Sequence, residues 1–131
     1  MPIAEARQAI EAMVGMQGES EAVARIEDRR IPGAVSDILV RIYTPQAKGP
    51  APILVYFHGG GWVIGSIASH DGVCRVLANR AGAIVVSVDY RLAPEHPFPA
   101  AAEDCYAATQ WVAEHTSALG GDPKRIAVGG D

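Results

Sequence analysis

The sequence has little of several features that mark specialised proteins. It holds only 2 cysteines in 131 residues, too few for a disulfide framework, and aromatic residues make up 6% of it. No apolar run approaches the length of a membrane span, and the first residues lack the basic and apolar regions of a secretory signal. No basic cluster offsets the net charge of −4, which argues against a nucleic-acid partner. We therefore expect a cytoplasmic protein without a membrane span.

Residues that bind metals or act as thiolates are scattered along the chain. Cys74 and Cys105 both fall in predicted helices, without a neighbouring cation that would favour a thiolate. A metal site built from His58, His70 and Asp71 would need separate loops to converge, and no ligand spacing supports one. We expect neither a metal nor a cofactor.

What the sequence does contain is the composition and pattern of a layered α/β protein. Hydrophobic residues make up 49% of it and charged residues 20%, which is typical of a chain that folds around a core. Apolar segments typical of strands alternate along the chain with segments of helical periodicity, and this order favours a parallel sheet with crossover helices. The predicted extended segments are 25–30, 37–44, 53–57, 83–88 and 126–128, and the predicted helices are 4–16, 71–81 and 100–117. Pro32-Gly33 predicts a hairpin-like connection between the first two extended segments.

The most informative motif follows the strand predicted at 53–57. Residues 55–62 are Val-Tyr-Phe-His-Gly-Gly-Gly-Trp. The three glycines remove every Cβ that would keep the main chain from a ligand, and they allow positive φ angles that point neighbouring N–H groups the same way. In acyl transfer, such a turn binds the negative oxygen of the tetrahedral intermediate. One or two glycines would indicate only a tight loop, but His-Gly-Gly-Gly-Trp between a strand and a helix matches the oxyanion loop of lipases and esterases.

A second motif lies at the other end of the sequence. Residues 124–131 are Lys-Arg-Ile-Ala-Val-Gly-Gly-Asp, a short apolar strand that enters a glycine turn. Gly130 and Asp131 match the first two positions of Gly-x-Ser-x-Gly, the nucleophile elbow, in which a strained strand-to-helix turn presents the serine. We expect the nucleophile directly after Asp131.

Together the two motifs resemble the hormone-sensitive-lipase-like branch of the α/β-hydrolases, which are microbial carboxylesterases with a His-Gly-Gly-Gly motif and a Gly-Asp-Ser-Ala-Gly elbow. The resemblance covers nearly all of residues 37–131 and keeps the order of the family's motifs. Its further pieces are Ser-Val-Asp-Tyr-Arg-Leu-Ala-Pro-Glu at 87–95, Phe-Pro-Ala-Ala at 98–101, Glu103-Asp104 and residues 125–131. It implies the N-terminal portion of an α/β-hydrolase fold, because such a domain usually takes about 200 to 300 residues.

The resemblance also implies a function, that of a serine carboxylesterase acting on short-to-medium acyl esters through an acyl-enzyme. The N–H groups of Gly59 and Gly60 would form the oxyanion hole, and His58 and Gly61 would support that loop. None of the triad is expected within residues 1–131: the serine, the acid and the histidine would all follow Asp131. His58 is not expected to be the base, since its place before the glycines fits an imidazole that hydrogen-bonds local main chain.

Several alternatives stay open at this stage. Trp62 and Tyr90 are candidates for substrate contact, although Trp62 could equally pack in the core. Residues 1–36 are expected to form a cap segment ahead of the catalytic part at 37–131, but their amphipathic helix could equally pack on the sheet. Asp89 and Arg91 follow a buried strand, and we expect them to be paired, because an unpaired buried charge is costly.

The expected partners are a small ester substrate and the remainder of the same polypeptide. A homodimer formed through an edge strand is left open by the sequence. Two other functions also remain as alternatives: a non-catalytic small-molecule receptor on the same scaffold, and a truncated chain that serves only as an interaction piece.

Overall fold

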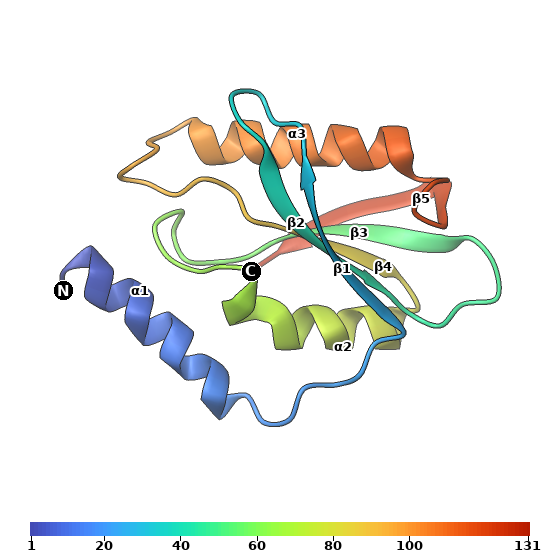
Figure 1. Ribbon diagram of the computed structural model, residues 1–131, viewed down its shortest axis with the longest axis horizontal. Helices are drawn as coiled ribbons and strands as arrows, with labels where there is room; N and C mark the ends of the chain where they lie inside the picture. Colours follow the sequence, from blue (N-terminus) through green and yellow to red (C-terminus); the bar gives the residue numbers. More distant parts are fainter.

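A five-stranded mixed sheet forms the centre of the computed structural model, which describes residues 1–131 (Figure 1). Its strand order is β1-β2-β4-β3-β5. β1 and β2 are antiparallel to each other, β2 is antiparallel to β4, and β4, β3 and β5 run parallel. The bounds are β1 Arg25–Ile31, β2 Ile38–Thr44, β3 Ala51–Phe57, β4 Ile84–Val88 and β5 Gly121–Gly130.

The sheet confirms the predicted α/β class and adds two features. The first two strands form an antiparallel hairpin joined near Pro32-Gly33, as predicted, so only part of the sheet is parallel. The last strand was predicted at 126–128 but runs from Gly121 to Gly130, because its main chain pairs with β3 well beyond its apolar centre. Pro123 is tolerated there because it lies between Gly121 and Ile126, where the register against β3 shifts and the ladder is irregular.

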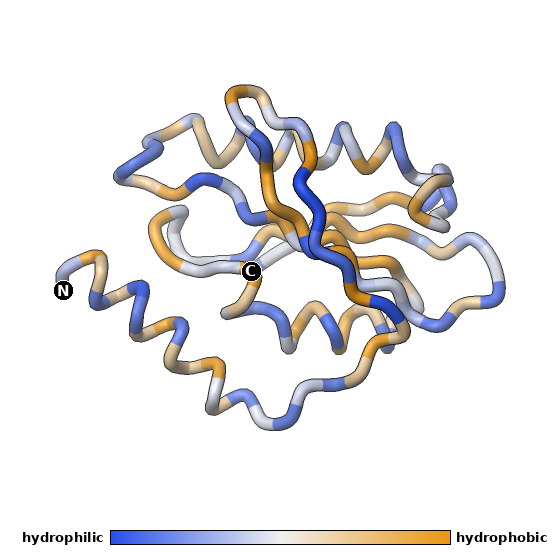
Figure 2. Tube along the Cα trace, viewed as in Figure 1, coloured by the Kyte–Doolittle hydropathy of each residue, from blue (hydrophilic) through white to orange (hydrophobic).

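Helices cover both faces of the sheet (Figure 1). Helix α3 (Ala100–His115) buries Ala108 and Val112 against one face, together with alternate residues of β2, β3 and β4. Helix α2 (Asp71–Ala81), which follows a short 3₁₀ turn at Ala68–His70, buries Cys74 and Ala78 against the other. Figure 2 shows the central strands as hydrophobic, whereas much of β1 is hydrophilic. α2 ends at Gly82, as predicted, because this glycine takes the left-handed conformation, with φ 60°.

The first helix lies away from the sheet (Figure 1). It comprises α1 (Ile3–Ala12), continued by a 3₁₀ turn at Met13–Met16, and α1 has no buried residue. The side chain of Arg7 donates hydrogen bonds to Val63 O (2.8 Å) and Ala93 O (3.1 Å) and pairs with Glu95 at 2.6 Å. This helix is therefore fastened to loops rather than packed on the sheet.

The segment expected to form a cap, residues 1–36, also contains β1, which pairs along its whole length with β2. Only α1 and the turn at Met13–Met16 lie outside the layers of the sheet. None of the helices combines the length and the hydropathy that crossing a membrane requires.

Candidate active site

Three loops meet at the edge of the sheet where the parallel strands end. β3 leads into His58 and the glycines, β4 into Asp89, and β5 into Asp131. The register sets Phe57 beside Gly130 on one side and beside Val88 on the other. Ligands of open α/β sheets usually bind at this carboxyl edge. The fold therefore brings together the two motifs that the sequence singled out.

The glycine turn has a backbone that only glycine adopts readily. Gly60 has φ 131° and Gly61 φ 61°, and a Cβ on Gly60 would lie 2.1 Å from Ile64 O. Gly60 O closes the turn by accepting the N–H groups of Val63 (3.2 Å) and Ile64 (3.1 Å). The N–H groups of Gly60 and Gly61 themselves donate to no protein acceptor. The turn thus holds two adjacent free donors.

The N–H of Gly59 is already engaged. It donates to Asp131 Oδ1 at 2.9 Å, and a Cβ on Gly59 would lie 2.6 Å from Asp131 Oδ2. The sequence analysis named Gly59 and Gly60 as the oxyanion donors, with Gly61 as support. The hydrogen bond to Asp131 argues against Gly59 in that role and in favour of Gly61, because an N–H given to a carboxylate does not also face a substrate.

Asp131 is the centre of a cluster that the sequence analysis missed. Its carboxylate accepts hydrogen bonds from Tyr56 OH (2.6 Å), the Gly59 N–H and His70 Nε2 (3.1 Å). We call these groups the Asp131 cluster. Burial alone would raise the pKa of the Asp131 carboxyl, but these three hydrogen bonds outweigh it and hold the pKa below its usual value. No local pattern joins the four residues, because they come from three separate segments: the end of β3 with its loop, the 3₁₀ turn at Ala68–His70 and the end of β5.

His58 lies beneath the glycine turn and is 2% exposed. Its Nδ1 lies 2.9 Å from Gly59 O, and its ring stacks on Tyr90 at 4.3 Å between centroids and 15° between planes. The Tyr90 hydroxyl donates to His58 O. Burial lowers the pKa of His58, so the neutral imidazole is favoured. These contacts place the His58 ring against the main chain of the glycine turn and against Tyr90, and its support of the loop stays a prediction.

Tyr90 and Trp62 occupy opposite environments. Tyr90 is 5% exposed and its hydroxyl is used within the protein, which argues against the substrate contact expected of it. Trp62 is 68% exposed, so it does not pack in the hydrophobic core around the sheet. It lines an apolar pocket of about 440 Å³ with Gly61 and Phe98, which is 91% exposed. Phe98 was not named as a site residue, because an aromatic residue between two prolines carries no functional signal of its own.

The two charged residues that follow β4, Asp89 and Arg91, differ in whether they form an ion pair. Arg91 donates to both oxygens of Asp104, which is 2% exposed, with its Nη2 2.9 Å from Oδ1. Asp89 is exposed, and its side chain makes no ion pair. The expected pairing is therefore confirmed for Arg91 and wrong for Asp89. No group of three or more metal-ligating side chains is placed to hold a metal ion.

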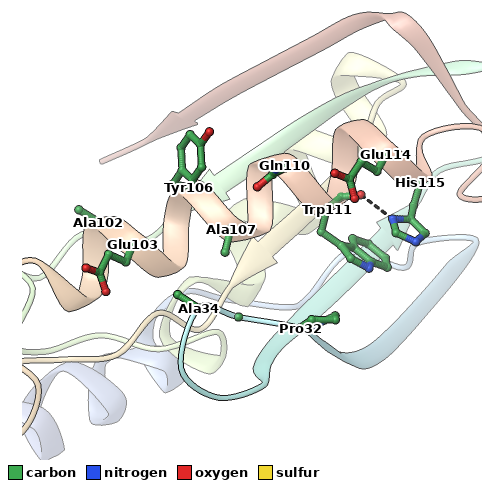
Figure 3. Close-up of a pocket in the computed structure, with 11 residues that line it drawn as sticks. Pro32, Ala34, Ala102, Glu103, Tyr106, Ala107, Gln110, Trp111, Glu114 and His115 are labelled. Carbon is green, nitrogen blue, oxygen red and sulfur yellow. Dashed lines mark hydrogen bonds between the residues drawn. The ribbon is translucent and has the colours of Figure 1, made fainter.

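A larger cavity, of about 840 Å³, lies elsewhere (Figure 3). It runs between α3 and the turn of the β1–β2 hairpin, with Trp111 and His115 at one end and Glu103 at the other. None of the residues of the glycine turn line it. The cavity beside the turn is smaller, about 330 Å³, and includes Gly60, Gly61 and Asp131 in its walls. The free donors, rather than cavity size, identify the candidate active site.

Comparison with known proteins agrees with this geometry. Residues 54–131 match the family described as the alpha/beta hydrolase fold, and the chain belongs to that family. The named esterases among its relatives confirm the resemblance to carboxylesterases drawn from the two motifs.

Two relatives and one solved structure show the extent of the similarity. The chain is 56% identical over 110 residues to Esterase LipI of Mycobacterium tuberculosis, covering 82% of this chain and 34% of that protein. It is 48% identical over 126 residues to Carboxylic ester hydrolase LipN of the same organism, covering 95% and 32%. A hyperthermophilic esterase from Pyrobaculum calidifontis superimposes with a TM-score of 0.95 at 49% identity, covering all of this chain and 42% of that one. The chain thus spans about a third of the length of the curated relatives it matches.

Proposed function

We propose that the whole protein is a serine carboxylesterase that hydrolyses short-to-medium acyl esters. The observation that carries the proposal is the pair of free N–H groups at Gly60 and Gly61, held beside Asp131 at the carboxyl edge of the sheet. Two adjacent amide donors without a protein acceptor suit an oxygen that becomes negative during reaction. The esterases among the relatives support this chemistry over mere anion binding.

In the proposed mechanism the nucleophile is a serine directly after Asp131. Its oxygen attacks the ester carbonyl carbon, its proton passes to a histidine from a later part of the protein, and the alcohol leaves with that proton. Water then attacks the acyl-enzyme by the same route and releases the carboxylic acid. The carbonyl oxygen would accept hydrogen bonds from Gly60, Gly61 and the residue after the serine. Loss of one such donor typically costs about 3 to 4 kcal/mol of transition-state stabilisation.

The substrate would lie between the glycine turn and α1. We propose that α1 and the turn at Met13–Met16 contribute to a cap, since they contact the loops of the site and not the sheet. Trp62 and Phe98 offer an apolar wall next to Gly61, which suits an acyl or alcohol group of a few carbons. We keep the cytoplasm as the proposed location, because both cysteines are free.

The proposal is tested with the full-length protein and a series of p-nitrophenyl esters from acetate to decanoate. We expect hydrolysis with a preference for the shorter chains, and covalent labelling by a phosphonate ester that maps to the residue after Asp131. A full-length protein that binds these esters without hydrolysis or labelling would be a non-catalytic receptor, and the proposal would fall.

A further inference from the structure

His70 makes a contact on each side of its ring. Its Nε2 lies 3.1 Å from Asp131 Oδ2, and its Nδ1 lies 2.8 Å from Ser69 Oγ. A carboxylate oxygen only accepts hydrogen bonds, so Nε2 carries the ring N–H and donates a hydrogen bond to Asp131 Oδ2. The ring is also largely enclosed, with 13% of the side chain exposed. His70 therefore fixes one oxygen of the carboxylate whose other oxygen holds Gly59.

The contacts of His70 continue to the first helix. Ser69 and Ser66 bind each other reciprocally, with Ser66 N 2.9 Å from Ser69 Oγ and Ser69 N 3.0 Å from Ser66 Oγ. The Ser66 hydroxyl donates to Glu11 Oε1 of α1 at 2.6 Å. A continuous chain of hydrogen bonds thus runs from Glu11 through Ser66, Ser69 and His70 to Asp131. Gln17, just past the first helix, adds a hydrogen bond to Ser69 O at 3.0 Å.

This chain matters to α1 because the helix has little else to hold it. None of its residues is fully buried, and of its larger apolar side chains only Ile10 is half-buried, so apolar burial contributes only part of what holds its position. Its polar contacts to the rest of the protein are those of Arg7 and Glu11. The Arg7 contact to Val63 O reaches the glycine turn directly, because the Val63 N–H donates to Gly60 O, whereas the Glu11 contact leads to the groups around Asp131.

We propose that His70 is a positioning residue, which couples the docking of α1 to the arrangement of the oxyanion donors. With His70 in place, Asp131 holds the Gly59 N–H, and the N–H groups of Gly60 and Gly61 face the substrate. Without it, Asp131 Oδ2 loses its partner, only Tyr56 and the Gly59 N–H remain on Oδ1, and the turn loses one of its supports. This inference rests on the proposed esterase function, and it adds that residues of the cap act on the rate of the reaction and not only on substrate entry.

The test uses the full-length protein with five single variants. His70→Ala and Glu11→Gln break the chain at two places. His115→Ala, at the far end of α3, and Glu5→Gln, on the same helix as Glu11, are the matched controls, since neither residue contacts the chain. His70→Gln is the conservative variant, which keeps an N–H donor for Asp131.

Three measurements are made on each variant: kcat and KM for p-nitrophenyl butyrate, inhibition by a trifluoromethyl ketone, and hydrogen exchange of the peptide that covers residues 58–66. We expect His70→Ala to lower kcat by about 10- to 100-fold, less than the 10²–10³-fold that follows loss of a donor. KM should change little, ketone affinity should fall with kcat, and exchange in 58–66 should accelerate. Glu11→Gln should show the same pattern more weakly, and His70→Gln should recover part of kcat.

The outcomes separate the two proposals. If His70→Ala matches His115→Ala in kcat and in exchange, His70 does not position the turn and the inference falls. If kcat falls only in proportion to the folded fraction, measured by circular dichroism, the role is structural and the inference also falls. If the wild type hydrolyses no ester, the esterase proposal falls. The hydrogen exchange of His70→Ala and Glu11→Gln then still decides whether α1 and the glycine turn are coupled.

Discussion

Two aspartates of this protein, Asp71 and Asp131, have similar partners but different surroundings. Each accepts a hydrogen bond from a tyrosine hydroxyl at 2.6 Å, Asp71 from Tyr43 and Asp131 from Tyr56. Asp71 is further paired with two arginines, Arg41 at 3.2 Å and Arg75 at 2.7 Å. We call Asp71 and these three partners the Asp71 cluster.

The difference lies in what each cluster leaves unpaired. In the Asp71 cluster both carboxylate oxygens meet cations. In the Asp131 cluster the partners are a hydroxyl, an amide and a histidine, and the next two amides along the chain have no acceptor. A saturated cluster contributes to stability, whereas one that ends in unpaired donors is prepared for a ligand. The hydrogen bonds therefore distinguish Asp71, whose partners stabilise the fold, from Asp131, which lies beside the unpaired donors of the candidate active site.

The largest expected effect falls on the free donors themselves. In full-length protein, Gly60→Ala should lower kcat by at least 10²–10³-fold, because a Cβ there meets Ile64 O at 2.1 Å and the turn must move. The measurement is kcat for a p-nitrophenyl ester in folded protein. Gly49→Ala is the matched control, since a Cβ at Gly49 meets nothing within 4 Å. An active Gly60→Ala variant would show that this turn does not hold the oxyanion.

Substituting each of the two aspartates in turn should separate an effect on reaction rate from an effect on folding stability. Asp71→Asn leaves Arg75 without a charged partner and Arg41 with Asp28 alone, so we expect a loss of about 1 to 3 kcal/mol in unfolding free energy with kcat of the folded protein unchanged. Asp131→Ala should lower kcat about 10- to 100-fold, since it frees the Gly59 N–H, and should change the unfolding midpoint less. Denaturant unfolding and steady-state kinetics measure the two effects. A lower kcat in Asp71→Asn, or an unchanged kcat in Asp131→Ala, would contradict the different roles given to the two aspartates.

The exposed aromatics should affect selectivity rather than stability. Trp62→Ala should change the unfolding free energy by no more than about 0.5 kcal/mol, as is usual for surface positions, yet alter the preference among acyl chain lengths. Ratios of kcat/KM across the p-nitrophenyl series measure this. Tyr106→Ala is the control, because this tyrosine is 72% exposed on α3 and lines the cavity of Figure 3 instead. Equal selectivity in both variants would remove Trp62 from the substrate pocket.

The smallest expected effect concerns pH. Burial alone would raise the pKa of Asp71, but hydrogen bonds from Tyr43, Arg75 and Arg41 and the charge of Arg75 hold it below its usual value. A carboxyl with a depressed pKa stabilises the fold above its unfolded pKa, and this stability is lost as the pH falls through the folded value. Unfolding free energy should therefore decrease in the acid range below about pH 4, and less steeply in Asp71→Asn. An equal slope in both proteins would contradict the role given to Asp71.

Much of the fold could be predicted because its signals are local. The helix predicted at 71–81 and the strands predicted at 53–57 and 83–88, observed as α2, β3 and β4, follow from apolar runs that end in glycine or polar turns. The strand at 126–128 was predicted too short, because the ends of β5 are polar and are extended only by pairing with β3. Likewise, the hydrogen bond from Gly59 to Asp131 joins residues 72 positions apart, which no local pattern contains.

The sequence by itself determined the α/β class, the hairpin, the glycine turn and the Gly-Asp pair at 130–131, since each depends on residues close together in the chain. Only the tertiary structure decided which glycine amides are free, which histidine meets Asp131 and where the first helix lies. The reason is that parallel strands collect distant loops at one edge of a sheet, and hydrogen bonds there are shared among residues that are not neighbours in sequence.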